Sequence, residues 1–280
     1  MKYVLFFAMF FLAFSCKSQD TSTTSKDNIS QIIRDTFTII SVQNPKSHIS
    51  IDSFETATSK NRKQSSNETH HIWNDLLKAY VSEDGQVDYS GFKKNHTKLL
   101  EYFKVLEDYF TESQLNKNEK LAYWINAYNA FTIDLILRHY PIKSIKDIKN
   151  PWDQRLWKLK NTWYSLNDIE HTILRKMQEP RIHFAIVCAS VSCPNLQNEA
   201  FQSSILDKQL TIATTSFLSD TSKNKIEKNH LELSKIFQWF SKDFKQNGGL
   251  IDFLNQYVPF EISEKATKRF KTYNWNLNEL

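Results

Sequence analysis

The chain has 280 residues, with 36 Lys and Arg against 31 Asp and Glu, a formal net charge of +5. Basic and acidic residues are interleaved along the chain, so the excess charge does not indicate a nucleic-acid groove, and we expect no nucleic-acid partner. Aromatic residues make up 14% of the chain, and there are only four glycines. Scarce glycine together with long periodic apolar segments favours an α+β fold that is predominantly helical, with a small sheet.

Residues 1–16 have the pattern of a signal peptide. Lys2 supplies a positive end, and the apolar run from Val4 to Phe14 is too short to span a bilayer. The run ends in LAFSC, which resembles the lipobox of bacterial lipoproteins, although Ala13 stands where Leu is commonest. We therefore expect Cys16 to carry a lipid that anchors the protein to the bacterial cell envelope, facing the periplasm or the surface. The alternative is an ordinary cleaved leader with an unrelated cysteine.

The next segment, residues 17–68, predicts a polar tether. It is rich in Ser, Thr, Lys, Asn and Gln, a composition that does not favour a packed core. Two short β-forming runs, Thr36–Val42 and Ile49–Phe54, predict a hairpin within the tether. Residues 69–280 predict a single domain.

Three helices are expected in the first half of this domain. Apolar residues recur at helical spacing over residues 71–80 and 96–110. Residues 118–139 are apolar nearly all round, which predicts a buried helix. Asn126 and Asn129 lie within that buried run, on neighbouring turns. A buried amide without partners costs about 1–3 kcal/mol, so we favour amides that hold adjacent loops over amides that orient a catalytic group or ligand.

The second half of the domain contains further helix and strand signals. Residues 165–168 and 204–207 each have the spacing of a capping box at a helix start. Residues 225–233 alternate around a turn and predict a hairpin. A short helix is expected over residues 250–257 and a terminal strand over residues 270–278.

Most of the candidate chemistry lies in residues 181–196, RIHFAIVCASVSCPNL. Ile182–Val187 is short, apolar and rich in β-forming residues, which predicts a buried strand around which the small sheet is built. This strand would place Cys188 at its end, and a turn-like sequence with Ser190 and Cys193 follows. Because scaffolds often present reactive groups on loops after strands, we expect a cleft near Cys188.

Several motifs in chain order resemble the domain-of-unknown-function 547 family, over about residues 72–278. The motifs are Asp84–Tyr89 (DGQVDY), Ala122–Ala130 (AYWINAYNA), Ser165–His171 (SLNDIEH) with Leu174-Arg175, Pro180–Ala185 (PRIHFA), Cys188–Ser190 (CAS), Ser192–Pro194 (SCP), Ser234–Trp239 (SKIFQW) with Asp243-Phe244, and Tyr273–Asn278 (YNWNLN). Asn274 stands where the pattern leads us to expect Asp. The resemblance implies a bacterial envelope protein and no established activity.

We expect the site to be that of a thiol-dependent hydrolase of an amide or ester. Cys188 would be the nucleophile and His171 its base, with Glu170, Asn126 or Asn129 as the residue that holds the base in its tautomer. Adjacent helical residues point about 100° apart, so one of Glu170 and His171 should face the site and the other the protein. His183 is the second choice of base, because five residues along a strand would place it roughly 16 Å from Cys188 on the opposite face.

Two other interpretations of the same residues stay open. In the first, the protein is a non-catalytic envelope module that binds a small molecule, peptide or glycan, with Cys188 and Cys193 bridged or merely buried. In the second, His171, His183 and the two cysteines bind zinc. Neither a Cys-x2-Cys nor a His-Glu-x2-His spacing is present, so we favour this least and expect no metal and no cofactor.

Overall fold

The computed structural model describes residues 69–110, 115–246 and 248–280. The predicted signal peptide, the lipidated Cys16 and the tether with its hairpin lie outside the described residues. All the described residues belong to one compact unit. Within the described ranges, no helix is both long and apolar enough to cross a membrane.

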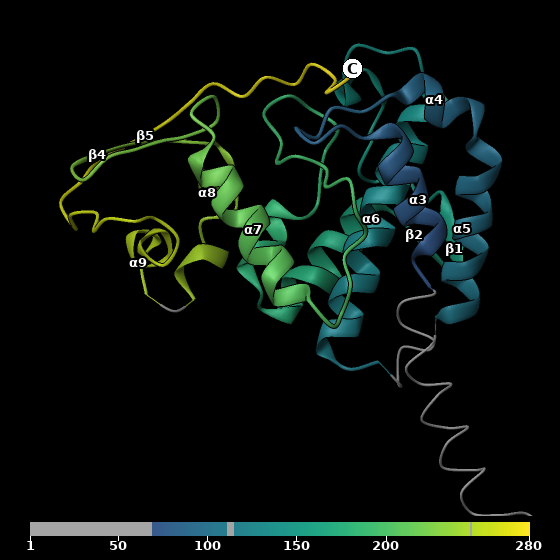
Figure 1. The fold of residues 1–280 in the computed structure, drawn as a ribbon, viewed down its shortest axis with the longest axis horizontal. Coiled ribbons are helices and arrows are strands. Elements are labelled where there is room, and N and C mark those ends of the chain that lie inside the picture. Colours follow the sequence, from purple (N-terminus) through teal and green to yellow (C-terminus); the bar gives the residue numbers. More distant parts are fainter. Residues whose placement is uncertain (1–68, 111–114, 247) are drawn as a thin grey trace, which may run out of the picture. The chain divides into compact units, whose positions relative to one another are not determined.

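The described fold is predominantly helical, with two small sheets, which confirms the predicted α+β class (Figure 1). The α-helices are α3 (His71–Tyr80), α4 (Tyr89–Lys94), α5 (His96–Tyr109), α6 (Lys117–His139), α7 (Leu206–Ser219), α8 (Ile236–Trp239) and α9 (Leu250–Asn255). The short helices of other pitch are η2 (Ile145–Asp147), the π helix η3 (Asp168–Ile173), and the 3-10 helices η4 (Leu174–Met177), η5 (Pro180–Phe184) and η6 (Asp243–Lys245).

The strands form one pair and one three-stranded sheet. Strands β1 (Trp157–Leu159) and β2 (Thr162–Tyr164) pair antiparallel. Strands β3 (Lys225–Ile226) and β4 (His230–Leu233) form the predicted hairpin, and β5 (Thr267–Phe270) lies parallel to β4. The predicted terminal strand is therefore misplaced, because β5 ends at the residue where it was expected to begin.

Helix α6 is the centre of the first half of the fold. The side chains of Asn116 and Glu119 form a capping box at its start, and all residues from Leu121 to Leu137 are buried. A helix that is apolar all round has no face for solvent, so the prediction of a buried helix from the sequence is confirmed.

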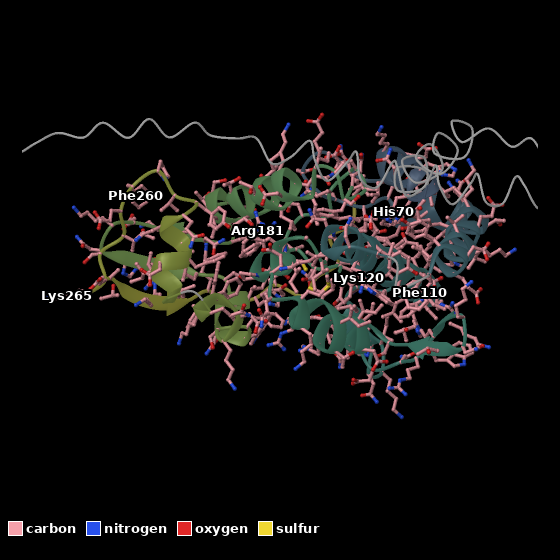
Figure 2. The ribbon with its side chains drawn as sticks, turned by 90° about the horizontal axis from the view of Figure 1, so that it is seen from below. His70, Phe110, Lys120, Arg181, Phe260 and Lys265 are labelled. Atoms are coloured by element: carbon pink, nitrogen blue, oxygen red, sulfur yellow. The ribbon has the colours of Figure 1, made fainter. Side chains whose placement is uncertain are left out.

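Buried side chains form two hydrophobic clusters. The first surrounds α6 and takes in α3, α5 and the segment before Cys188; the second is formed by α7, β4, α8 and α9. In Figure 2, His70 and Phe110 mark the part that holds the first cluster, and Phe260 and Lys265 lie at the opposite end. Cys188 packs against both clusters, so it lies where they meet.

The predicted buried strand Ile182–Val187 is wrong. Pro180–Phe184 forms the 3-10 helix η5, and residues 185–187 run irregularly to Cys188. The backbone of this segment bonds to a side chain of α6 instead of a neighbouring strand: Asn129 accepts from the Val187 N–H and donates to the Ala185 carbonyl. The apolar run therefore reflects burial alone, which a short helix or loop needs as much as a strand does.

Only one of the two predicted capping boxes forms. Ser165 and Asp168 exchange side-chain-to-backbone hydrogen bonds before η3, as predicted. The box at residues 204–207 is wrong, because α7 has Ile205 at its N-cap with no side-chain cap. The side chain of Gln209 from the first turns of α7 holds the preceding segment instead, through the backbone of residues 200 and 202.

Candidate functional site

A cavity of about 200 Å³ lies where the two hydrophobic clusters meet. Five of the residues predicted for the site line it: Glu170 and His171 from η3, His183 from η5, and Cys188 and Cys193 from the loop that follows. Aromatic side chains make up much of the remaining wall, and these are Tyr128, Trp152, Trp239, Phe240, Tyr273 and Trp275. A mostly apolar cavity with a few convergent polar groups is the usual form of a small-molecule site.

The two α6 amides lie outside the cavity lining and hold loop backbone. Asn126 donates to the Phe201 carbonyl at 2.8 Å and accepts from the Phe201 N–H at 2.9 Å. Asn129 donates to the Ala185 carbonyl at 2.9 Å and accepts from the Val187 N–H at 3.0 Å. Both are structural amides, the role favoured from the sequence, and Asn129 fixes the backbone that leads directly to Cys188.

The Cys188 thiol has three hydrogen-bond partners. Its Sγ lies 2.8 Å from Cys193 Sγ and 3.2 Å from both Ser190 Oγ and the Tyr273 hydroxyl. Burial raises the pKa of the Cys188 thiol, but these three hydrogen bonds together outweigh burial, so the net pKa lies below the usual value. Ser190 does not line the cavity and acts on the site through this contact.

Cys193 behaves in the opposite way. Burial and the neighbouring Cys188 raise the pKa of its thiol well above the usual value. The backbone N–H of Cys188 donates to Cys193 Sγ at 2.7 Å, so Cys193 can direct its own S–H toward Cys188. Of the two thiols, Cys188 is therefore the one that ionises more readily. Neither cysteine forms a disulfide in this structure.

The loop that carries both thiols is held by the C-terminal segment. The N–H groups of Val191 and Ser192 donate to the carbonyls of Asn276 and Asn274 at 2.9 and 3.2 Å. The Ser192 hydroxyl accepts from the Asn274 N–H at 2.8 Å. Figure 1 shows this segment running back from β5 toward α4. The same segment carries Tyr273, whose hydroxyl contacts Cys188 Sγ.

Glu170 is buried, and only one of its two carboxyl oxygens has a hydrogen-bond partner among the described residues. The Tyr128 hydroxyl donates to Oε2 at 3.1 Å, and none of the described residues hydrogen-bonds to Oε1. Burial raises the pKa of Glu170 from 4.5 to about 7, against the smaller opposing effect of Tyr128. The negative charge of Glu170 also acts to raise the pKa of Cys188, so the two groups interact electrostatically. Glu170 can therefore give or accept a proton near neutrality.

His171, the expected base, is poorly suited to that role. Arg175 Nη1 lies 2.8 Å from His171 Nδ1. Because a guanidinium can only donate, Nδ1 must accept, which leaves the proton of the neutral ring on Nε2. Burial and the Arg175 charge both lower the pKa of His171. A second proton would have to go to Nδ1, facing the guanidinium.

Both Glu170 and His171 line the cavity, so the expectation that one of them faces the protein is wrong. They lie on η3, whose π-helical turn is wider than that of an α-helix, so neighbouring side chains diverge less around the axis.

His183 is held in the opposite tautomer. Its Nε2 lies 2.9 Å from Asp243 Oδ2, and Arg175 forms a bidentate ion pair with the same carboxylate. Burial acts to raise the pKa of Asp243, but hydrogen bonds from His183 and Arg175 outweigh it and hold that pKa well below its usual range. A carboxylate only accepts, so His183 donates from Nε2 and its Nδ1 is the basic atom.

The His183 ring is neutral and fixed in place. Burial lowers its pKa, more than Asp243 raises it, and the ring stacks on Phe240 with centroids 4.0 Å apart. His183 and Cys188 share the cavity without a hydrogen bond between them. His183 lies on the 3-10 helix η5 and not on an extended strand, so the predicted separation from Cys188 on opposite faces of a strand is wrong.

Residues 112–218 match the DUF547 family. Its description is "Protein of unknown function, DUF547". No curated protein and no solved structure matches the chain. The DUF547 match spans α6, η3, η5 and both thiols, and it ends before Asp243 and Tyr273. It is thus shorter than residues 72–278, the range over which the motifs resemble the family.

Four residues that hydrogen-bond to the predicted site residues were not themselves predicted for the site: Tyr128, Arg175, Asp243 and Tyr273. Arg175 follows His171 by four residues, a helical spacing that signals contact. Asp243 and Tyr273 lie 60 and 85 residues from their partners His183 and Cys188, and no local pattern joins them. Among the described residues, no group of three or more His, Cys, Asp or Glu side chains is arranged to hold a metal ion.

Proposed function

We propose that this protein is a thiol-dependent hydrolase of an amide or ester, with Cys188 as its nucleophile. The observation that carries the proposal is the Cys188 thiol, which lines a cavity, has three hydrogen-bond partners that lower its pKa, and shares that cavity with the Glu170 carboxyl. The thiolate is the nucleophilic form of cysteine. A proton-transfer group in the same cavity is the second part that covalent catalysis needs.

The acylation step follows from these positions. The Cys188 thiolate attacks the substrate carbonyl carbon, a C–S bond forms, and the carbonyl electron pair moves onto oxygen. The Tyr273 hydroxyl, 3.2 Å from Sγ, is a donor for this oxyanion. Burial raises the pKa of Tyr273, which keeps that proton in place. When the C–N or C–O bond breaks, Glu170 gives its proton to the leaving group.

Hydrolysis of the thioester completes the cycle. Glu170, now a carboxylate, takes a proton from a water molecule as the water attacks the acyl carbon. The C–S bond breaks, the acid leaves, and both the Cys188 thiolate and protonated Glu170 are restored. His183, oriented by Asp243 and with Nδ1 unprotonated, is a second proton acceptor in the same cavity.

Acyl transfer from an activated ester tests this function. The full chain with Cys16→Ser has only Cys188 and Cys193 as thiols, and intact mass after p-nitrophenyl acetate should show one acyl group that is lost with time. Cys188→Ala should remain unmodified. Cys193→Ala, the matched control, keeps the nucleophile but loses one donor to it, so it should acylate more slowly. Equal acylation of Cys188→Ala, or none in the parent, would overturn the proposal.

A binding module without turnover is the second candidate, and the aromatic wall favours it. Trp239, Tyr273 and Trp275 pack on one another with ring centroids 4.6 to 5.7 Å apart, and Trp239 is 45% exposed. Such faces suit a flat apolar surface on a small molecule, peptide or glycan. Quenching of tryptophan fluorescence by a ligand that is never cleaved, and its loss in Trp239→Ala, would support this candidate.

We also propose the lipid anchor in the bacterial envelope, which rests on residues 1–16 alone. Growth of a bacterial host with an alkyne-bearing palmitate should label the wild-type chain. Cys16→Ser should not be labelled, and Cys188→Ser, the matched control, should be labelled as wild type. A wild-type chain without label would contradict the anchor and leave the ordinary cleaved leader.

A further inference from the structure

We infer that Cys188 and Cys193 form a redox pair, in which a peroxide oxidises Cys188 and Cys193 converts the product into a reversible disulfide. The regulatory consequence rests on the proposed function, because the disulfide would remove its nucleophile. The disulfide itself does not depend on that function.

The first support is direct contact between the two thiols. Their sulfur atoms lie 2.8 Å apart, and the backbone N–H of Cys188 donates to Cys193 Sγ. The intervening loop already turns back on itself, since the Cys193 N–H donates to the Ser190 carbonyl at 2.9 Å. A disulfide needs sulfur atoms about 2.05 Å apart. The resolving thiol therefore needs no rearrangement of secondary structure to reach its target.

The second support is the difference between the two thiols. Both cysteines line the cavity, but Cys188 is half-buried whereas Cys193 is only 5% exposed. An oxidant entering the cavity meets Cys188 first, and the hydroxyls of Ser190 and Tyr273 stabilise its thiolate. Redox-sensing cysteines combine an accessible thiolate with a neighbouring resolving cysteine, and this loop has both.

The chemistry balances with a peroxide as the oxidant. The Cys188 thiolate attacks one peroxide oxygen, an S–O bond forms, the O–O bond breaks, and the departing hydroxide takes a proton to become water. Cys193 then loses its proton and attacks the Cys188 sulfur. An S–S bond forms and the hydroxyl leaves as a second water. The two sulfurs together lose two electrons, which reduce the peroxide.

Under oxidation we expect the hydrolase to lose its activity reversibly and to be protected from irreversible oxidation of Cys188. With Cys188 in a disulfide there is no thiolate to attack a carbonyl. The disulfide also stops the sulfur from proceeding to sulfinic and sulfonic acids, which are not recovered by thiols. A dithiol reductant attacks the disulfide, passes through a mixed disulfide, and returns both cysteines to the reduced state.

The test uses the full chain with Cys16→Ser and one equivalent of hydrogen peroxide. The expected product has lost two hydrogens by intact mass, has no thiol that iodoacetamide can label, and regains both thiols with dithiothreitol. Cys193→Ser should stop at a sulfenic acid on Cys188, trapped by dimedone. Cys188→Ser, the matched control, should react far more slowly, because only the buried thiol remains. A parent chain that gains oxygen without forming the disulfide would overturn the inference.

The two proposals fail in different ways. A chain that forms the disulfide but is never acylated by p-nitrophenyl acetate would keep the redox pair and lose the hydrolase. A chain that is acylated but goes directly to sulfinic acid under peroxide would keep the hydrolase and lose the redox pair. If both hold, acylation should disappear after peroxide and return in full with dithiothreitol.

Discussion

At the residue scale, the chemistry of this site depends on which atom holds each proton. Arg175 can only donate, so its contact at 2.8 Å makes His171 Nδ1 an acceptor. Asp243 as a carboxylate can only accept, so His183 must donate from Nε2. The two imidazoles in one cavity therefore present opposite tautomers. Only His183 keeps an unprotonated nitrogen that is not engaged by a cation.

Tyr273 can donate its hydroxyl proton to Cys188 Sγ and so stabilise the thiolate. Its hydroxyl lies 3.2 Å from Cys188 Sγ, and Tyr273→Phe removes that donor without removing the ring. The pKa of Cys188 should rise, so alkylation by iodoacetamide should slow severalfold at neutral pH and approach the wild-type rate at alkaline pH. Tyr257→Phe, which alters a tyrosine outside the cavity lining, is the control. An unchanged pH profile would mean that the hydroxyl does not stabilise the thiolate.

At the scale of elements, α6 was predictable and the segment before Cys188 was not. The α6 pattern is local: from Leu121 to Leu137 its buried residues surround the whole helix axis, which a strand cannot reproduce. Ile182–Val187 is too short to distinguish strand from buried helix by periodicity. What decides its structure is Asn129, 56 and 58 residues away in the chain, whose amide satisfies the backbone.

Distance along the chain also explains which site residues could be found. Some site residues could be predicted because reactive side chains lie close together in the sequence. These are Cys188 with Cys193, and Glu170 with His171. Asp243, which orients His183, comes from η6, and Tyr273, which contacts Cys188, comes from the C-terminal segment, so only tertiary packing brings these two residues to the site.

The two amides of α6 provide a matched pair of variants. Asn126→Ala and Asn129→Ala each leave one buried backbone N–H and one carbonyl without a partner. Each should lower the free energy of unfolding by about 2–4 kcal/mol, measured by urea denaturation. Only Asn129→Ala should also change the rate of Cys188 alkylation, because Val187 is the residue before Cys188 and Phe201 is remote from it in the chain. Equal effects on alkylation would show that the loop is held by other contacts.

At the scale of the whole molecule, the cavity lies where two hydrophobic clusters meet. Burial of an ionisable group at this position lowers the free energy of unfolding. The burial that shapes the cavity also buries Glu170 and raises its pKa to about 7. Near and above neutral pH the folded protein must keep the ionised Glu170 carboxylate in a poorly solvated position. Ionisable groups whose burial costs stability in this way cluster at functional sites.

The cost should appear in the pH dependence of unfolding. Between pH 4.5 and about 7 the unfolded chain releases the Glu170 proton while the folded chain retains it, so stability falls as pH rises through this window. Buried His70 acts in the opposite direction: its pKa is lowered to about 3, the unfolded state binds the proton below 6.5, and stability rises with pH. The two effects partly cancel in the wild type.

Glu170→Gln should separate the effect of Glu170 on stability from that of His70. Glutamine keeps the acceptor for the Tyr128 hydroxyl but cannot ionise, so the variant avoids the burial of a charge. Its gain in unfolding free energy over wild type should be near zero at pH 4.5 and grow to about 3 kcal/mol above pH 7. Urea denaturation across this range measures the difference, with the exposed Glu264→Gln as control. A difference that stays constant with pH would mean that Glu170 ionises as freely in the folded chain as in the unfolded one. Loss of acylation in the same variant would then connect the energetic cost to the chemistry that it supports.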